Sequence, residues 1–227
     1  TTPYDPSLLG ADCSRCILSD KGKPRRPVPS ELNPGATLAA VGEAPGIVEA
    51  EAGKPFRAQS GIEWERTIRA AGLRRRRFAI FNALACRPAD VVGGEDTGSW
   101  QRMDAKLHAI NRSRKRKGEQ PHPHPVDCCR GRLLRDLKGA HGVLALGGSA
   151  LRALTGTGAI LRWRGSPLRV QLPQAPDEDQ PALSTLPPPS PPAEDAGRRQ
   201  AHEAWVFPTL HPAFALHKGP GEAFEVV

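Results

Sequence analysis

Short apolar runs recur along the chain, and most are closed by a glycine or a polar residue. They lie at residues 37–42, 78–82, 143–147 and 205–207. A short apolar run bounded by turn residues predicts a buried strand. The pattern therefore predicts four strands, separated by stretches that are long enough to hold helices.

Amphipathic stretches between the strands predict the helices. They span residues 60–71, 99–115, 126–139 and a stretch that begins at Ser149. Ser60 is the expected N-cap of the first helix and Gly72 its stop, because these residue types favour those positions. The Gly-, Pro- and Glu-rich segment 42–61 is expected to be a loop.

Strands that alternate with helices favour a parallel sheet with helices on both faces. We expect an α/β fold, a three-layer αβα sandwich around a central four-stranded, mainly parallel sheet. A length of 227 residues fits a single domain covering residues 1–227. Glycine (23 residues) and proline (24 residues) together exceed the usual ~12%. Two polar segments, 88–124 and the Pro-rich 173–203, are expected to be flexible insertions.

Charge narrows the classes of partner. The chain has 32 basic and 24 acidic residues, a net charge of +8 and a pI near 9.7. This excess favours polyanions such as nucleic acid, although solubility alone also explains it. We expect no membrane association, because the apolar runs are too short to span a bilayer and no secretory leader is visible. The chain begins without Met, so we expect a trimmed chain or a fragment.

Five cysteines are spread over three parts of the chain. They are Cys13, Cys16, Cys86, Cys128 and Cys129. A Cys-x-x-Cys pair with two distant cysteines can form one four-thiolate site, which suits zinc or an iron–sulfur cluster. The distribution of the cysteines over three segments favours an iron–sulfur cluster, in which one of Cys128 and Cys129 would not be a ligand. Unrelated buried thiols remain the alternative, and the histidines at 121–125 are expected in an ordinary exposed loop.

Polar and glycine residues follow the predicted strands. The strand ends carry the segment 42–46, Asn82, Gly147 and His211. In parallel sheets, ligands bind at the carboxyl ends of the strands. The pattern therefore predicts a ligand site that combines a carboxylate, an amide and an imidazole.

Taken together, these motifs resemble the uracil-DNA glycosylase superfamily, and most closely its iron–sulfur-containing family four. Four segments carry the resemblance in order along the chain: Gly42-Glu43-Ala44-Pro45-Gly46, Asn82 through Pro88, Ala145-Leu146-Gly147, and His211-Pro212-Ala213-Phe214. Cys13, Cys16, Cys86 and Cys129 match the ligands of that family's four-iron, four-sulfur (4Fe-4S) cluster, with Cys129 favoured over Cys128 by its distance from Leu133. The cluster is expected to be structural.

The resemblance implies hydrolysis of the bond between uracil and the DNA sugar, leaving an abasic site. It implies that Phe56 stacks on the flipped base and Asn82 hydrogen-bonds its edge. His211 would stabilise the uracil anion, and Glu43 would position or activate water. The backbone of the first motif would line the pocket, at Gly42, Ala44, Pro45 and Gly46. Taken alone, Asn82 and Glu43 also suit caps, and His211 a structural turn.

The same resemblance implies a DNA partner, single- or double-stranded, for a monomeric protein of a prokaryotic cytoplasm. Leu216 and Lys218 follow the last motif and are expected on the DNA-facing loop, with Leu216 as a wedge. Two basic runs, 74–77 and 112–117, are read either as phosphate contacts or as solvated surface.

Departures from the family leave other functions open. The insertions are unusual, Arg57-Ala58 replaces a hydrophobic-Gly pair, and no closing helix follows the last motif. Ser60-Gly61 is similar to a sister group that removes other damaged bases, although Glu43 argues against membership. The alternatives are a weak or inactive iron–sulfur DNA-binding homologue, a glycosylase for another deaminated base, and one that covalently traps the abasic sugar.

Overall fold

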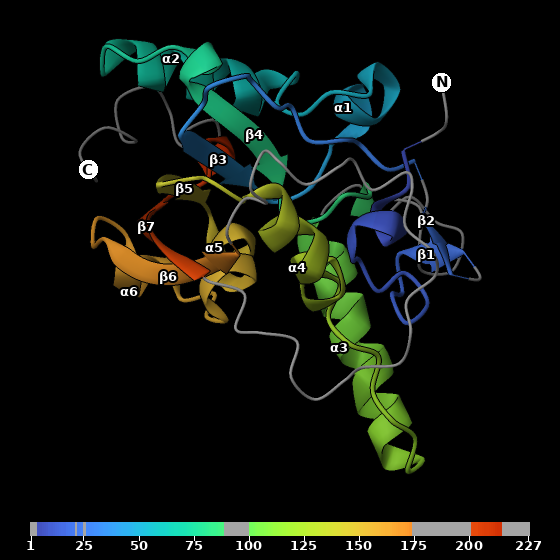
Figure 1. Ribbon diagram of the computed structural model, residues 1–227. Helices are drawn as coiled ribbons and strands as arrows, with labels where there is room; N and C mark the ends of the chain where they lie inside the picture. The colour runs from blue at the N-terminus through green and yellow to red at the C-terminus, as the bar shows by residue number, and fades with distance from the viewer. Residues whose placement is uncertain (1–3, 21, 25, 89–99, 174–200, 215–227) are drawn as a thin grey trace, which may run out of the picture.

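A five-stranded sheet forms the centre of the computed structural model, which describes residues 4–20, 22–24, 26–88, 100–173 and 201–214 (Figure 1). Its strands are β3 Leu38–Gly42, β4 Phe78–Asn82, β5 Gly142–Leu146, β6 Leu168–Pro173 and β7 Ala201–Thr209. The spatial order is β4-β3-β5-β7-β6, with β6 antiparallel to β7 and the other pairs parallel. The predicted mainly parallel sheet is confirmed.

The predicted number of strands was one too low, because β6 was not anticipated. Its side chains alternate, with exposed Arg169 and Gln171 between the inward-facing Leu168, Val170 and Leu172. This is the period-two pattern of an edge strand, and a proline at its end is tolerated there. The Pro-rich sequence that begins at Pro173 drew the sequence interpretation towards a loop.

The strands β4, β3 and β5 are largely buried on both faces, as their apolar sequences require, whereas Trp205 and Phe207 of β7 are 43% and 44% exposed. Ala39 and Val41 pack into one hydrophobic cluster, while Ala40 between them packs into the other. On the first face lie α4, Pro125–Asp136, and α5, Gly148–Thr155; on the second lies α2, Gln59–Ala70 (Figure 1). The three-layer αβα sandwich is therefore confirmed.

Helix boundaries differ from the predictions at two places. The N-cap of α2 is Ala58, so Ser60 lies inside the helix and was wrongly predicted as its cap. The segment 42–61, predicted as loop, contains the short helix α1, Ile47–Ala52, which ends at Gly53 in a left-handed conformation. Six residues carry too weak a periodic signal to be recognised in a sequence.

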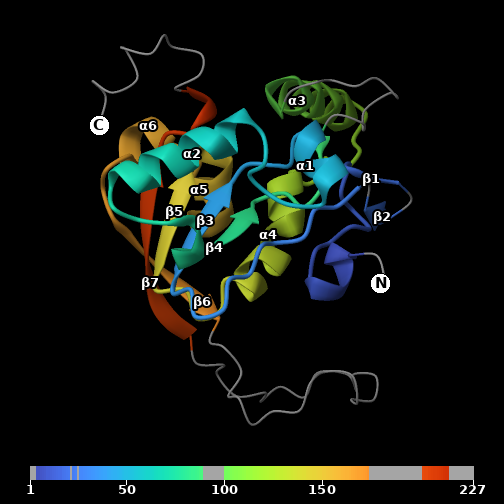
Figure 2. The same ribbon diagram turned by 90° about the horizontal axis from the view of Figure 1, so that it is seen from above.

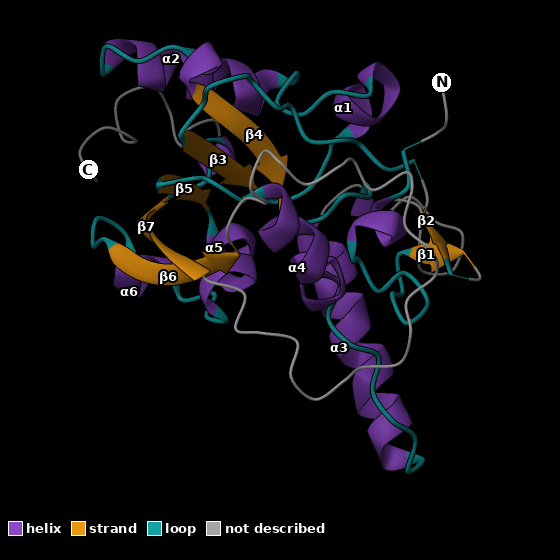
Figure 3. Cartoon of the chain, viewed as in Figure 1, coloured by secondary structure: helices purple, strands orange, loops and turns teal. Residues whose placement is uncertain are grey.

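The predicted insertion 88–124 contains a long helix, α3, Trp100–Arg116 (Figure 3). This agrees with the helix predicted at 99–115. A four-residue helix, α6 Ile160–Trp163, precedes β6, and the 3-10 turn η2, Arg75–Arg77, leads into β4. No helix in the described ranges is long and apolar enough to cross a membrane.

The N-terminal segment packs against α4. It contains the 3-10 helix η1, Pro6–Leu9, and the short hairpin of β1, Ser19–Asp20, and β2, Lys23–Pro24. Gly10 and Gly131 bring the backbones of this segment and α4 together, since a side chain at Gly131 would collide with the Gly10 carbonyl. This contact places Cys13 and Cys16 beside the cysteines of α4.

Candidate active site

Gly42 and Asn82 are partners in the register of β3 and β4, at the carboxyl ends of both strands. A Cβ atom at Gly42 would lie 2.7 Å from Cζ of Phe56 and 2.8 Å from Oδ1 of Asn82. Real Cβ atoms do not approach that closely, so glycine is required there. The absence of a side chain brings the edge of an aromatic ring and an amide against one point of the backbone.

Phe56 is fixed from several sides. Its ring stacks on Trp64 at 5.4 Å between centroids and 21° between planes. Its backbone has φ of 53°, which is uncommon for a non-glycine residue. Gly61 packs against it, because a Cβ there would lie 2.8 Å from Phe56 Cα. Arg75 Nη1 donates to the Phe56 carbonyl at 3.2 Å.

Glu49 joins the loop after β3 to the loop that holds Phe56. The residue is 5% exposed. One carboxylate oxygen accepts from the Gly46 N–H at 3.1 Å, and the other from the N–H groups of Arg57 and Ala58 at 3.0 and 2.9 Å. A buried carboxylate with three backbone donors is well compensated, so it holds both loops in place.

Asn82 presents an amide with no hydrogen bond to any residue that the structure describes, although the residue is only 8% exposed. Its backbone, in contrast, is fixed, because the Asn82 carbonyl accepts from Arg132 Nη2 at 2.6 Å. The next residues are tied to β3, since the Ala83 and Leu84 N–H groups donate to the carbonyls of Gly42 and Glu43. A buried amide usually has partners, so a free one points to a ligand.

Glu43 lies against the start of α5. Ser149 Oγ donates to Glu43 Oε2 at 2.9 Å. Burial raises the pKa of the Glu43 carboxyl; the Ser149 hydrogen bond opposes this rise, and the negative charge of Asp104 adds to it. The carboxyl is therefore held by one oxygen and accepts a proton more readily than an exposed glutamate.

His211 has its tautomer fixed by the backbone. The Ala213 N–H donates to His211 Nδ1 at 3.2 Å, so a neutral ring carries its proton on Nε2. Burial lowers the pKa of His211 to about 4, so the ring is neutral at pH 7. Gly147, with φ of 92°, lies close, because a Cβ on it would be 3.1 Å from His211 Cβ.

The predicted polar residues thus form two adjoining groups. Phe56, Gly42 and Asn82 make one, and the turn between β5 and α5 brings Glu43 and His211 to Ser149 and Gly147. Of the remaining first-motif residues, Ala44 packs against the core, Pro45 is buried and Gly46 is the N-cap of α1. All lie at the carboxyl edge of the sheet, as predicted. Leu216 and Lys218 lie outside the described residues.

The five cysteines line a common pocket. It is lined by Pro6, Ala11, Asp12, Cys13, Cys16, Leu18, Ser19, Cys86, Cys128 and Cys129. All five thiols are free and buried. Within the described ranges, no three His, Cys, Asp or Glu side chains come close enough together to hold a single metal ion. The thiols therefore converge from three segments without forming a compact one-ion site.

Backbone contacts fix the walls of this cysteine pocket. Ser19 Oγ donates to the carbonyls of Cys13 and Cys16, and the Asp12 N–H donates to the Cys128 carbonyl at 2.8 Å. Burial raises the pKa of the Cys13 thiol to about 11. A hydrogen bond between Cys16 and Cys128 raises the pKa of Cys16 and lowers that of Cys128. Both Cys128 and Cys129 line the pocket, so the preference for Cys129 stays a prediction.

Comparison with known proteins identifies the family. The model of the uracil-DNA glycosylase superfamily matches residues 29–226 of the chain. This chain belongs to that superfamily. It is also similar to a type-4 uracil-DNA glycosylase of Pyrobaculum aerophilum, at 36% identity over 77 residues. That alignment covers 34% of this chain and 38% of the relative.

Membership of the superfamily confirms the resemblance read from the motifs. The structure adds residues that sequence reasoning missed: Trp64 under the Phe56 ring, Glu49 between two loops, Ser149 on Glu43, and Arg132 on the Asn82 carbonyl. A buried arginine or glutamate is rare, but burial is not visible in a single sequence. Ser149 was anticipated only as the first residue of a helix.

The basic run 74–77 divides into two roles. Arg75 has a structural role, because it forms ion pairs with Glu31 and Glu65 at 2.8 and 2.9 Å. Arg74, Arg76 and Arg77 are exposed. They precede β4, so they lie at the amino edge of the sheet, opposite the strand ends that carry the site.

Proposed function

We propose that this protein removes uracil from DNA by hydrolysing its N-glycosidic bond, leaving an abasic site. The observation that carries the proposal is the free amide of Asn82, held beside the Phe56 ring at the carboxyl edge of the sheet. Superfamily membership and the similarity to a type-4 enzyme support the same assignment.

Asn82 supplies the selectivity for the base. Its amide offers one acceptor and two donors, so it can accept from uracil N3–H and donate to O4. Cytosine reverses donor and acceptor along that edge, which would leave buried groups unpaired, and such mismatches discriminate strongly. The Arg132 bond to the Asn82 carbonyl holds the strand end in position for this pairing.

Phe56 and Gly42 supply the space and the surface for a flipped base. A target base must leave the duplex before its sugar bond can be attacked. One face of the Phe56 ring is stacked on Trp64, so a planar base would stack on the opposite face. Glycine at position 42 keeps the floor between ring and amide free of a side chain.

His211 and Glu43 would act on the reacting bond. Bond cleavage leaves negative charge on uracil and oxocarbenium character on the sugar, as in other glycoside hydrolyses. The neutral His211 ring donates from Nε2 to the developing anion, and one such donor is worth ~3–4 kcal/mol in comparable sites. Glu43, held at Oε2 by Ser149, would orient the attacking water through its other oxygen.

We further propose that four thiols of the cysteine pocket, Cys13, Cys16, Cys86 and Cys129, hold a four-iron cluster. Thiolates are the donors such clusters require, and a cluster spreads its ligands more widely than one ion does. The pocket fits this donor set because five buried thiols from three segments face one space. When bound, the cluster would cross-link those segments, with no part in the chemistry.

The test is excision from a single-stranded oligonucleotide with one uracil, with alkali to reveal abasic sites. The wild-type protein is compared with Asn82→Ala, and thermal melting confirms that both are folded. Cleavage by wild type and its loss in Asn82→Ala is the expected result. Iron-loaded, folded wild type that binds DNA and yields no abasic site would overturn the proposal in favour of a binding protein.

A further inference from the structure

The helix α3 and the segment 117–124 that follows it form an arm that extends from the body of the molecule (Figure 3). The base of the arm is anchored in the core, where Met103 and Leu107 are 0% and 2% exposed. The segment 117–124, called the return segment below, ends at His124, whose Nε2 lies 3.2 Å from Asp104 Oδ1. The arm is therefore fixed at its root by apolar and polar contacts.

The return segment is bound to the helix along its length. Asn111 Nδ2 donates to the His122 carbonyl at 2.9 Å, and the His122 N–H donates to Asn111 Oδ1 at 2.8 Å. Arg114 Nε donates to the Gln120 carbonyl at 2.7 Å, and its guanidinium pairs with Glu119 at 3.0 Å. These contacts hold the return segment against the helix and so fix the position of the tip.

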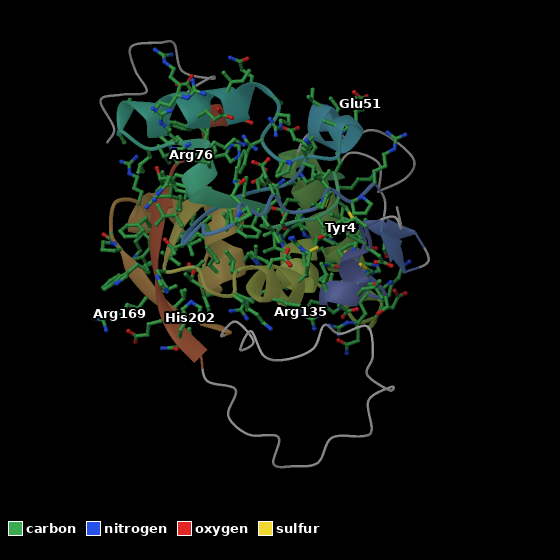
Figure 4. The ribbon with its side chains drawn as sticks, turned by 45° about the horizontal axis from the view of Figure 1, so that its top comes forward. Tyr4, Glu51, Arg76, Arg135, Arg169 and His202 are labelled. Atoms are coloured by element: carbon green, nitrogen blue, oxygen red, sulfur yellow. The ribbon has the colours of Figure 1, made fainter. Side chains whose placement is uncertain are left out.

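The tip is strongly positive. Arg112, Lys115, Arg116 and Lys117 are exposed and have no ion pair within the described part of the chain. The one nearby acid, Glu119, is already paired with Arg114. A second exposed basic run, Arg74 with Arg76 and Arg77 (Arg76 is labelled in Figure 4), lies at the amino edge of the sheet, away from the candidate site. Unpaired cations concentrated on one rigid end are suited to a polyanion.

The arm starts beside the candidate active site. Asp104, near its root, is close enough for its charge to raise the pKa of Glu43. Figure 2 shows α3 on the side of the molecule to which the β3 and β4 arrows point. At ~1.5 Å per residue, the helix carries Arg116 about 18 Å beyond Asp104. Base pairs rise ~3.4 Å along the axis of a DNA duplex, so an arm lying along that axis would reach about five base pairs from its root.

We propose that the tip of the arm, Arg112 with Lys115, Arg116 and Lys117, binds DNA phosphates about five nucleotides from the target base. The partner follows from the proposed function; the phosphate contacts follow from the charge and place of the tip. Lysine and arginine bind phosphates through charge, so these contacts are expected to contribute affinity that is independent of base sequence.

The experiment compares two triple variants of equal charge. One is Lys115→Gln/Arg116→Gln/Lys117→Gln at the tip; the control is Arg74→Gln/Arg76→Gln/Arg77→Gln at the amino edge of the sheet. Binding to a 24-base-pair duplex without uracil is measured by fluorescence anisotropy across salt concentrations. This readout does not depend on excision, so it separates failure of the arm from failure of the glycosylase assignment.

The tip variant is expected to bind the duplex at least ~10-fold more weakly near 0.1 M salt and to lower the salt slope by about 2–3, because each lost phosphate contact contributes ~0.9. The control is expected to change affinity less than ~2-fold. The tip variant should excise uracil less efficiently than wild type from a long substrate, in which the uracil lies ten nucleotides from either end. It should match wild type on a short substrate, in which the uracil lies three nucleotides from both ends. Equal loss in both triple variants, or none in the tip variant, would overturn the proposal.

Discussion

Replacing Gly42 with alanine tests the geometry of the base pocket directly. The new methyl group would meet Phe56 Cζ at 2.7 Å and Asn82 Oδ1 at 2.8 Å. Ordinary van der Waals contact begins near 3.4 Å, so the ring must give way by about 0.7 Å and the amide by about 0.6 Å. Trp64 restricts the shift of the ring and Arg132 fixes the Asn82 backbone, so the amide must rotate in addition to the shift of the ring.

The expected cost separates into stability and activity. One extra methyl in a well-packed place costs ~1–3 kcal/mol of unfolding free energy. A misplacement approaching 1 Å at a positioning group costs ~100-fold in rate. Gly42→Ala is therefore expected to remain folded and to lose about two orders of magnitude in kcat/KM for uracil excision.

Single-turnover excision and urea unfolding measure these two quantities. The matched control is Gly158→Ala, because a Cβ there meets nothing nearer than 3.5 Å. That variant should keep both wild-type activity and stability. If Gly42→Ala excised uracil at the wild-type rate, the contact between Gly42, Phe56 and Asn82 would have no part in base binding, and the pocket as described would be wrong.

Three further predictions concern acid–base groups and an ion-pair network. His211 has a folded-state pKa of about 4, below its unfolded value, so it stabilises the fold above pH 6.5 by at most ~3 kcal/mol. This stabilisation is lost as the pH falls towards 4, so urea unfolding of His211→Gln should show a smaller loss of stability than wild type over this range. Ser149→Ala removes the hydrogen bond that lowers the pKa of Glu43, so the acid limb of the pH–rate profile should move to higher pH, and the substitution should have no further effect in a Glu43→Gln background. Arg75→Met removes the arginine that Glu31 and Glu65 share and should lower the free energy of unfolding in urea by ~2–4 kcal/mol. An unchanged unfolding midpoint would contradict a stabilising role for these ion pairs.

The sequence predicted most of the sheet because the patterns there are local. The strands ending at Gly42 and Asn82 are short apolar runs closed by a turn residue, and both were placed to within a residue or two. The edge strand β6 was missed because its alternating residues run into Pro173. The helix α1 was missed because its six residues lie among glycines.

The candidate site was predicted for a different reason. Asn82 and His211 are recognisable because parallel strands bring their carboxyl ends to one edge, so residues far apart in sequence can be grouped. Their supporting contacts were not predictable. The three backbone donors on Glu49 and the Ser149 bond to Glu43 depend on how loops close in space, and no local pattern encodes that closure.

The helix α4 carries Cys129 and Arg132 within a single turn. Arg132 is 1% exposed and grips the Asn82 carbonyl, while Cys129 faces the cysteine pocket. One turn of helix α4 thus contacts both the candidate base pocket and the cysteine pocket. A displacement of this turn at the sulfur end, for example by oxidation of the thiols, would also displace the strand end that is proposed to read the base. Damage to the sulfur site would then weaken base recognition at a distance while the groups that act on the bond remained intact.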